Sequence, residues 1–237
     1  MADSEIAQAA ALAANAAPAG AIDQLLRFMA DGGPVLYLLA VISVLTLTLI
    51  IAKLIQFWSL RVHALGFVEP VLRDWRAGHA VEALGALGRE RNPVARVLET
   101  ALRGAGGDVR GDTLAREEVA RVAGLQLDTL RSGLRALALI ASISPLIGLL
   151  GTVIGMIAAF QTLQEAGNRV DPSILSGGIW VALLTTAAGL IIAIPAAAAH
   201  NWMEGIVYRA QRAMEDAATQ VFTRPAGTGP DAGRPAA

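Results

Sequence analysis

The sequence has 237 residues, of which 54% are hydrophobic and 16% are charged, and its mean hydropathy is +0.53. This composition is too apolar for an ordinary soluble domain and is typical of a membrane protein with a modest aqueous portion. The formal net charge of −1 provides no overall positive field for binding nucleic acid. Because the sequence contains no cysteine, disulfides and thiolate metal sites are excluded.

The first 33 residues predict an extension that precedes the apolar part of the chain. Residues 1–20 are rich in Ala and are either disordered or a short helix. The segment Ile22–Ala30 predicts a small amphipathic helix lying at the membrane interface. Its apolar face would carry Ile22, Leu25, Leu26 and Met29.

Three charge-free segments are long enough to cross a bilayer. They are Val35–Ala52, Leu137–Phe160 and Gly177–Ala199, and they predict transmembrane helices at 34–58, 137–163 and 177–200. At 1.5 Å per residue, the second segment spans about 36 Å, against roughly 30 Å for the hydrocarbon core. The predicted fold class is therefore an all-α membrane protein with three transmembrane helices.

The remaining segments predict helical extensions of this membrane part. Residues 59–136 predict a soluble helical domain of three short helices and a longer one. Apolar residues from Val119 to Leu137 recur at helical spacing without a strong breaker, so one helix is predicted from about 113 to about 164. A polar turn is predicted at 164–176, a continuation of the third helix at 201–223, and a disordered tail at 224–237.

The distribution of arginine predicts the orientation of the chain. Most arginines lie in 59–136 or after the third apolar segment, whereas the N-terminal extension and the 164–176 turn contain only Arg27 and Arg169. The positive-inside rule then places the N-terminus and the turn outside, and the large loop and the C-terminus in the cytoplasm. Helices two and three are thus expected to extend far into the cytoplasm, beside a small helical bundle.

Small residues form a stripe on each of the last two apolar segments. Such stripes allow helices to approach closely. The residues concerned are Ser144, Gly148, Gly151, Thr152 and Gly155 on the second segment, and Gly178, Ala182, Thr186, Gly189 and Ala193 on the third. The spacing leaves two roles open for Thr152 and Thr186. Each hydroxyl either bonds a carbonyl of its own helix and aids packing, or lines a path for ions.

Other features bear on chemistry mainly by exclusion. Pro145 and Pro195 each remove a backbone donor and predict kinks. The isolated histidines have no metal-ligand spacing, and neither a nucleotide loop nor a serine elbow is present, so no metal, cofactor or enzymatic activity is expected. The second and third segments contain no ionisable residue at mid-membrane. If the chain serves proton flow, the titrating group must come from elsewhere.

Two sequence runs resemble the proton-channel family that includes ExbB, TolQ and MotA. They are SPLIGLLGTVIGMIAAF and ALLTTAAGLIIAIPA followed by HN, and the resemblance covers about Leu36–Phe222, most strongly 133–201. Three helices with a large loop between the first two are more similar to ExbB and TolQ than to MotA. The N-terminal extension favours the ExbB-like branch, which energises uptake through TonB, over the TolQ-like branch of envelope maintenance.

The resemblance implies a homopentamer in the bacterial inner membrane that encloses two single-helix partners of the ExbD or TolR type. The partner helix would supply the membrane aspartate, and force would pass to a TonB-like or TolA-like protein. Thr152 and Thr186 match the two pore-lining threonines of the family. Lys53 matches a basic residue near the inner end of helix one, and Asn201 matches the Asn after the AIPA segment.

The sequence departs from the family pattern at one position. Family members usually carry a Glu before the TAxGL motif, near the outer end of helix three, and here Val181 takes its place. Three interpretations follow: the acid is dispensable in this branch, the proton pathway differs, or the chain is a non-conducting membrane scaffold.

Overall fold

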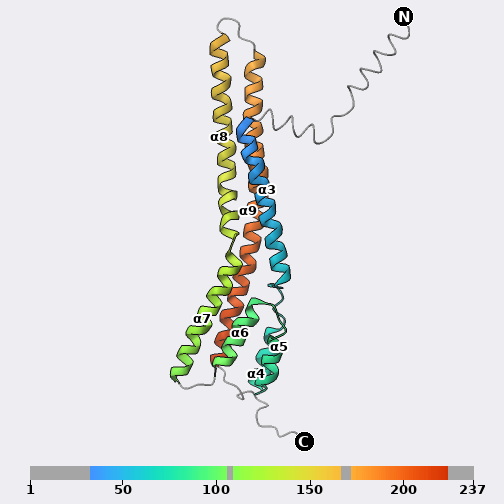
Figure 1. Cartoon of the computed structure of the whole chain (residues 1–237), viewed down its shortest axis with the longest axis vertical. Helices are drawn as coiled ribbons and strands as arrows, with labels where there is room; N and C mark the ends of the chain where they lie inside the picture. Colours follow the sequence, from blue (N-terminus) through green and yellow to red (C-terminus); the bar gives the residue numbers. More distant parts are fainter. Residues whose placement is uncertain (1–32, 106–108, 167–171, 224–237) are drawn as a thin grey trace, which may run out of the picture. The chain divides into compact units, whose positions relative to one another are not determined.

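The computed structural model describes residues 33–105, 109–166 and 172–223 (Figure 1). The amphipathic helix predicted within Ile22–Ala30 and the tail predicted at 224–237 lie outside these residues. The described residues form helices and no strand. The helices are α3 (Gly33–Ser59), α4 (Val68–Arg76), α5 (Ala80–Leu87), α6 (Pro93–Gly104), α7 (Val109–Arg131), α8 (Leu134–Ala166) and α9 (Pro172–Thr223).

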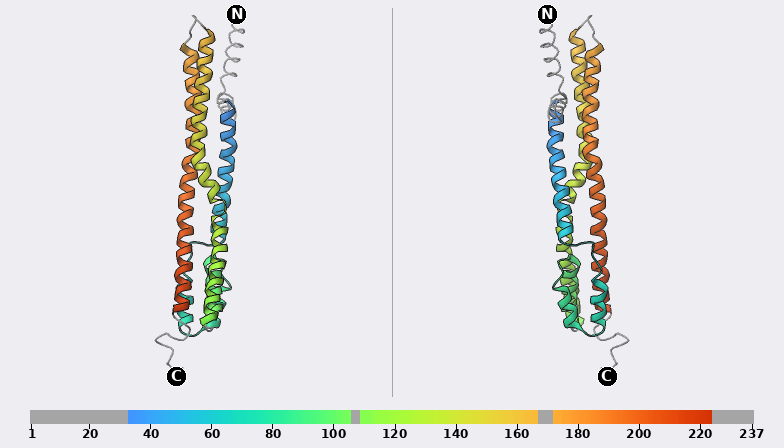
Figure 2. Two further views of the ribbon diagram at one scale, coloured as in Figure 1. Left: turned by 90° about the vertical axis from the view of Figure 1, so that its left-hand side faces the viewer. Right: turned by 90° about the vertical axis from the view of Figure 1, so that its right-hand side faces the viewer.

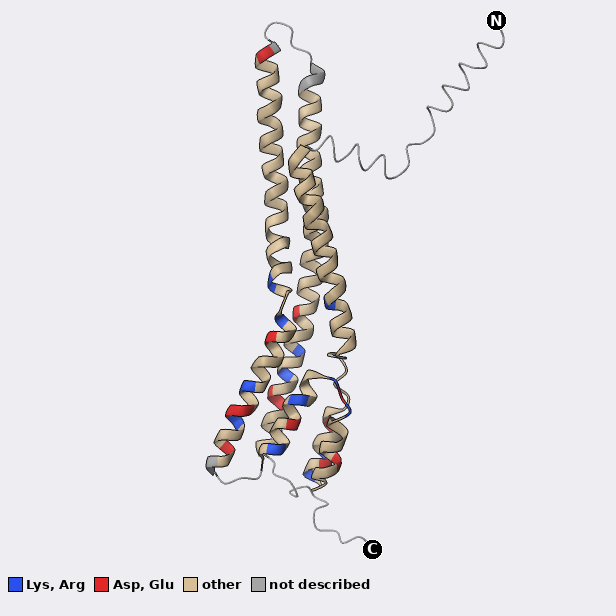
Figure 3. Ribbon diagram, viewed as in Figure 1, with Lys and Arg blue, Asp and Glu red and all other residues tan. Residues whose placement is uncertain are grey.

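Three of these helices are long and apolar enough to cross a membrane, namely α3, α8 and α9. They contain the three segments predicted from the sequence, and Figure 3 shows long stretches of α8 and α9 without a charged residue. The prediction of an all-α membrane protein with three transmembrane helices is confirmed. Pro145 and Pro195 lie inside α8 and α9, and neither proline ends its helix.

The contacts divide the described chain into two compact units. The first, here called the membrane unit, combines α3 up to Leu45 with the Ala141–Ile194 parts of α8 and α9. The second, here called the bundle unit, combines Thr46–Ile140 with α9 from Pro195 onward, and it contains α4–α7. Each unit is described by itself below.

The membrane unit presents large apolar side chains on its surface. Val44 of α3 is 66% exposed, Leu146 of α8 is 61% exposed and Ile191 of α9 is 70% exposed. In all three views of Figures 1 and 2, α8 and α9 run side by side through this unit. Such a surface suits lipid or another apolar helix, because exposing it to water would be unfavourable.

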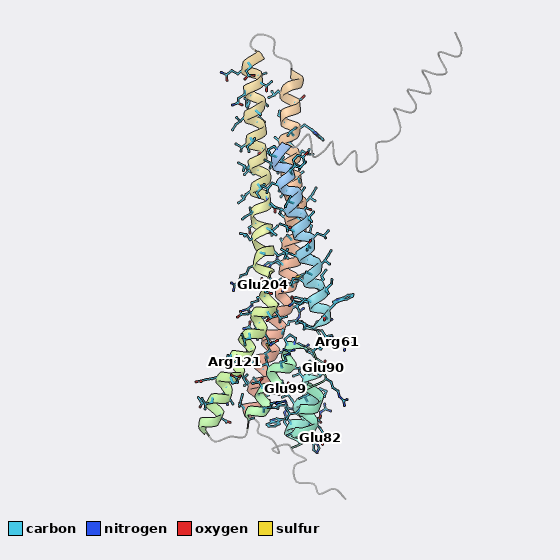
Figure 4. All side chains as sticks on the ribbon, viewed as in Figure 1. Arg61, Glu82, Glu90, Glu99, Arg121 and Glu204 are labelled. Carbon is cyan, nitrogen blue, oxygen red and sulfur yellow. The ribbon has the colours of Figure 1, made fainter. Side chains whose placement is uncertain are left out.

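The bundle unit has an ordinary hydrophobic core built from large side chains. Phe57, Leu72, Leu98, Leu130 and Met203 are almost completely buried there. The six charged residues labelled in Figure 4 all belong to this unit and come from several of its elements. Burial of apolar surface from water therefore supplies the main stabilising term of the bundle unit.

A buried asparagine fixes the start of α6 in this unit. The Asn92 side-chain oxygen accepts a hydrogen bond from the Val94 amide at 2.9 Å, with Pro93 at the first helical position. Its amide nitrogen donates to the carbonyl oxygens of Arg61 and Ala64 at 2.8 and 3.0 Å. Asn92 therefore caps α6 and ties it to the loop that follows α3.

The helix predicted to run unbroken from about 113 to about 164 is interrupted. Arg131 ends α7, Leu134 begins α8, and Gly133 between them adopts φ +75°, a left-handed conformation that favours glycine. The prediction missed this break because Leu130 and Leu134, on its two sides, both remain buried and keep the apolar spacing. We refer to Ser132 and Gly133 as the α7–α8 joint.

Candidate functional site

Small residues bring α8 and α9 into backbone contact within the membrane unit. A Cβ atom placed on Gly189 would lie 2.6 Å from the Ser144 carbonyl oxygen, and one on Gly148 would lie 2.8 Å from the Thr185 carbonyl oxygen. Further along, Gly155 packs on Ala182. The residue numbers rise on one helix as they fall on the other, so the two helices are antiparallel. Only glycine permits this approach.

The close approach lets two hydroxyls of α9 reach a carbonyl of α8. Thr185 and Thr186 each donate to the Gly148 carbonyl oxygen at 3.3 Å. Thr185 also lies 2.8 Å from the Ala182 carbonyl oxygen of its own helix and is almost fully buried, whereas Thr186 is half-buried. Gly148 is therefore the point at which both hydroxyls meet the partner helix.

Thr152 is placed differently from the α9 threonines. Its hydroxyl donates to the Leu149 carbonyl oxygen of α8 at 2.6 Å, and among the described residues it makes no hydrogen bond to α9. Its side chain is half-buried. The structure therefore brings Thr186 to the helix interface, while Thr152 is bonded within its own helix.

Thr185 was not singled out from the sequence. The spacing of Gly178, Ala182 and Gly189 fits either Thr185 or Thr186 as the fourth member, because both complete steps of three and four residues. The structure buries Thr185 more deeply and places it against Gly151, whose Cβ position would lie 2.5 Å from the Thr185 hydroxyl oxygen. Pairing the small-residue stripe of α8 with that of α9 could have indicated that Thr185 is the more deeply buried of the two threonines.

The other residues predicted for the site fall into both units. Ser144, Gly151 and Ala193 are buried in the membrane unit. In the bundle unit Lys53 is buried, whereas Asn201 is exposed. The predicted packing stripe and Lys53 therefore belong to separate structural units.

Val181 lines an apolar recess between α8 and α9. The recess measures about 280 Å³, and Thr162 contributes its hydroxyl-bearing side chain, which donates to the Ala158 carbonyl oxygen at 3.0 Å. The residues lining it are Gly155, Ala158, Ala159, Thr162, Gly177, Gly178 and Val181. No ionisable side chain lines the recess, so it cannot itself accept or release a proton.

These observations limit the chemistry of the membrane unit. Its described part of α8 and α9, up to Gln164 on α8, offers hydroxyls and backbone carbonyls but no Asp, Glu, Lys, Arg or His. Hydroxyls and carbonyls can hydrogen-bond a proton donor, but they do not titrate near neutral pH. A group with a suitable pKa would have to be brought to them.

A protein-family comparison matches residues 89–216 to the MotA/TolQ/ExbB proton channel family. This match covers more than half of the chain, from the α5–α6 loop through most of α9. The chain belongs to the MotA/TolQ/ExbB proton channel family. The sequence resemblance is thereby confirmed at the level of the family, and a multi-pass membrane location agrees with the three apolar helices.

Individual relatives agree with this assignment. An ExbB homologue in biopolymer transport from Methanothermobacter thermautotrophicus is 30% identical over 181 residues, covering 76% of this chain and 63% of the relative. The biopolymer transport protein exbB1 of Vibrio cholerae is 54% identical over 67 residues, which cover 28% of this chain and 29% of the relative. The Tol-Pal system protein TolQ of Haemophilus influenzae is 42% identical over 76 residues, which cover 32% and 33%. The chain thus spans less than two thirds of each relative.

Proposed function

We propose that this chain is the membrane subunit of an ExbB-type proton-driven motor in the bacterial inner membrane. Five copies would enclose two single-helix partners of the ExbD or TolR type, and the complex would pass the energy of the proton gradient to a TonB-like protein. Family membership and the relatives named as biopolymer transport proteins support this proposal. The N-terminus would lie outside and the 59–136 domain in the cytoplasm, as the arginine distribution suggests.

The observation that carries the proposal is the acid-free contact between α8 and α9. The helices meet at Gly148 and Gly189, two hydroxyls converge on the Gly148 carbonyl, and the paired segments contain no titratable group. An acid-free helix contact of this kind can serve proton transfer only when another chain contributes a carboxyl group. A single-helix partner with a membrane aspartate would meet that need.

Thr152 and Thr186 are the proposed contacts for that carboxyl group. Both are half-buried, so part of each side chain is accessible from outside the helix pair. The 3.3 Å bond of Thr186 is long for a hydroxyl donor, so this hydroxyl can turn toward a new acceptor at small cost. The Thr152 oxygen retains acceptor capacity while its proton is bonded to Leu149, so it can accept a hydrogen bond from a protonated carboxyl group.

The environment of Val181 favours a second candidate function. Because the recess around Val181 is apolar and lacks an acid, the chain could serve as a non-conducting scaffold for a membrane complex. A TolQ-like motor that maintains the envelope is the alternative within the same class, and the Haemophilus TolQ relative supports it. The two motor branches differ in their partner: a TonB-like protein should co-purify in the first and a TolA-like protein in the second.

Proton flux through the reconstituted complex tests the proposal. The chain and its single-helix partner would be placed in liposomes with a pH-sensitive dye inside, and flux would be driven by a potassium diffusion potential. Thr152→Val and Thr186→Val should each lower the flux by about tenfold, because each variant loses one hydrogen bond to the partner's carboxyl group. Replacing the partner aspartate by asparagine should abolish the flux.

Thr162→Val is the matched control, because Thr162 also lies on α8 and also bonds a carbonyl one turn earlier. This variant should conduct like the parent chain. Full flux in both Thr152→Val and Thr186→Val would remove the proposed role of these hydroxyls. An assembled complex that conducts no protons under any driving potential would instead support the scaffold.

A further inference from the structure

Lys53 is the only lysine in a chain that has 19 lysines and arginines together. At every other basic position the sequence uses arginine. Lys53 is also buried, with 7% of its surface exposed, while the arginines near the α7–α8 joint, Arg131 and Arg135, are exposed. The one lysine therefore occupies a buried position, and its surroundings should explain the choice of an ammonium group.

Three oxygen acceptors surround the Lys53 ammonium. Its Nζ donates to the Gln56 side-chain oxygen at 2.7 Å, to the Leu130 carbonyl oxygen at 3.1 Å and to the Ser132 hydroxyl oxygen at 3.4 Å. The Phe57 ring centre lies 5.8 Å from the same nitrogen. An ammonium group has three N–H donors and no acceptor, so these three contacts match its hydrogen-bonding capacity.

The two acceptors that lie outside α3 belong to the end of α7 and to the α7–α8 joint. Leu130 is in the last turn of α7, where backbone carbonyls lack partners within the helix and where a positive charge is favoured. Gln56 reinforces the contact, since its amide nitrogen reaches the Thr129 carbonyl oxygen at 3.5 Å. Ser132 in turn donates to the same Thr129 oxygen at 2.9 Å. One turn of α3 therefore caps α7.

The stem of Lys53 also fits the backbone of the joint. Gly133 has φ +75°, and a Cβ atom added there would lie 3.2 Å from Lys53 Cε. Position 133 therefore favours glycine for two reasons. Its backbone is left-handed, and the lysine stem passes close beside it. An arginine would bring a wider, planar head with five donors to a place that offers three acceptors around one point.

The charged groups near Lys53 do not include a partner carboxylate. Among the ion pairs that the described residues form within 4.0 Å, none involves Lys53. A recess of about 380 Å³ beside the joint is lined by Asp128, Arg131, Ser132, Gly133 and Arg135. The ammonium is therefore held by neutral oxygens, an arrangement suited to a fixed charge that caps a helix.

From these contacts we infer that Lys53 is a positioning residue that clamps the α7–α8 joint to α3, and that it does not carry protons. The clamp holds the last turn of α7 and the α7–α8 joint against one turn of α3. The clamp itself stands whether or not the complex conducts; only its effect on coupling rests on the proposed motor function.

The single lysine provides a direct chemical test in the full chain, embedded in nanodiscs. An amine-acylating reagent can modify only Lys53 and the chain's N-terminal amine, and mass spectrometry of peptides separates the two. In the folded chain, Lys53 should react at least about tenfold more slowly than in the SDS-unfolded chain. The hydrogen bonds of the folded ammonium group must break before the amine can react. Ser132→Ala and Gln56→Leu should each raise the folded-state rate. Reaction of folded Lys53 at the unfolded rate would overturn the clamp.

Hydrogen exchange tests the consequence for the joint. In Lys53→Met, amides of residues 128–137 should exchange faster, while peptides of α6 should be unchanged. Arg96→Met is the matched control, since it removes one positive charge from an exposed site on α6. Equal exchange in the parent chain and Lys53→Met would contradict the clamp. If Lys53→Met does not accumulate, the milder Ser132→Ala variant answers the same question.

Proton flux separates the clamp from a proton-carrying role. Lys53→Arg keeps a permanent charge that cannot be released near neutral pH. With a clamp, this variant should retain part of the flux with the pH profile of the parent complex, because its wider head can still reach some of the three acceptors, whereas Lys53→Met should lose coupling. Complete loss of flux in Lys53→Arg with an intact exchange pattern would assign proton transfer to Lys53. If even the parent complex lacks flux, the proposed motor function fails, while labelling and exchange still decide the clamp.

Discussion

The two units of this chain are held together in opposite ways. In the membrane unit, the residues at the helix contact are the smallest available, and the large side chains, such as Leu146 and Ile191, face outward. In the bundle unit, large side chains such as Phe57, Leu98 and Met214 fill the centre, and most charged ones, apart from the buried Lys53, lie outside. The same chain thus reverses the usual distribution of large residues between its two parts.

The difference follows from the solvent of each unit. In water, burying a large apolar side chain is itself favourable, so the bundle unit gains most from leucine and phenylalanine inside. In lipid, a leucine gains little by leaving the acyl chains, so helices associate through close backbone packing and hydrogen bonds. The volume of a side chain should therefore have opposite effects on stability in the two units.

The largest effect is expected where bulk is added to the membrane contact. Gly189→Leu would force α8 and α9 apart, because even a Cβ atom there would lie 2.6 Å from the Ser144 carbonyl oxygen. The expected result is loss of the folded chain from the membrane fraction, measured by detergent-extracted yield and by SDS resistance. Gly177→Leu is the matched control on the same helix, since no atom lies within 4 Å of its Cβ position. Equal loss in both variants would show that helix propensity, and not packing, is responsible.

In the bundle unit, removing side-chain volume from the core should lower stability. Leu98→Ala removes a fully buried side chain from its core and should lower the free energy of unfolding by about 2–5 kcal/mol. Leu149 of α8 is 55% exposed, so Leu149→Ala, which removes the same atoms, should cost much less. SDS titration followed by circular dichroism would measure both. A larger effect at Leu149 would contradict the distinction drawn between the units.

The two units also differ in how well their sequences predict them. The three apolar helices and the small-residue stripes follow from charge-free length and spacing, so the helix pair of the membrane unit could be predicted with its main residues, including Gly148 and Gly189. Spacing alone could not choose between Thr185 and Thr186, because a pitch of 3.6 residues accepts either one. That choice depends on the register of the partner helix, which the two stripes define only when they are paired.

The bundle unit was less predictable because its key contacts are distant in sequence. Asn92 joins the start of α6 to Arg61 and Ala64, and Lys53 joins α3 to Leu130. Neither contact leaves a local pattern in the sequence. The break at Gly133 was hidden for a related reason: the apolar stripe continues across it, so one glycine in a helical pattern did not reveal that the helix ends there.

A moderate effect is expected from removing the buried Thr185 hydroxyl, which bonds from α9 to α8 in the membrane unit. Thr185→Val keeps the shape of the side chain but removes its bonds to Gly148 and Ala182. The expected loss is about 1 kcal/mol in the free energy of unfolding, since hydrogen bonds between membrane helices contribute modestly. Thr162→Val, whose hydroxyl bonds only its own helix, should change the SDS titration midpoint less. If the two variants are equally destabilised, the hydroxyl contact across the helices contributes nothing special.

The smallest effect is expected from an exposed ion pair on the surface of the bundle unit. Two of the three guanidinium nitrogens of Arg121, Nε and Nη2, donate to the Glu118 carboxylate at 2.7 and 2.6 Å, and this hydrogen bonding lowers the pKa of the Glu118 carboxyl group. A carboxyl group with a lowered pKa stabilises the folded state above its unfolded pKa, and this contribution is lost as the pH falls through the folded value. Glu118→Gln should therefore lower the Tm slightly at pH 7, and the difference from the parent chain should shrink as the pH falls through the folded pKa of Glu118.

Because both side chains are exposed, salt should reduce the difference further. A shift at pH 7 as large as that of Leu98→Ala would mean that surface charge, and not the buried core, dominates the stability of the bundle unit.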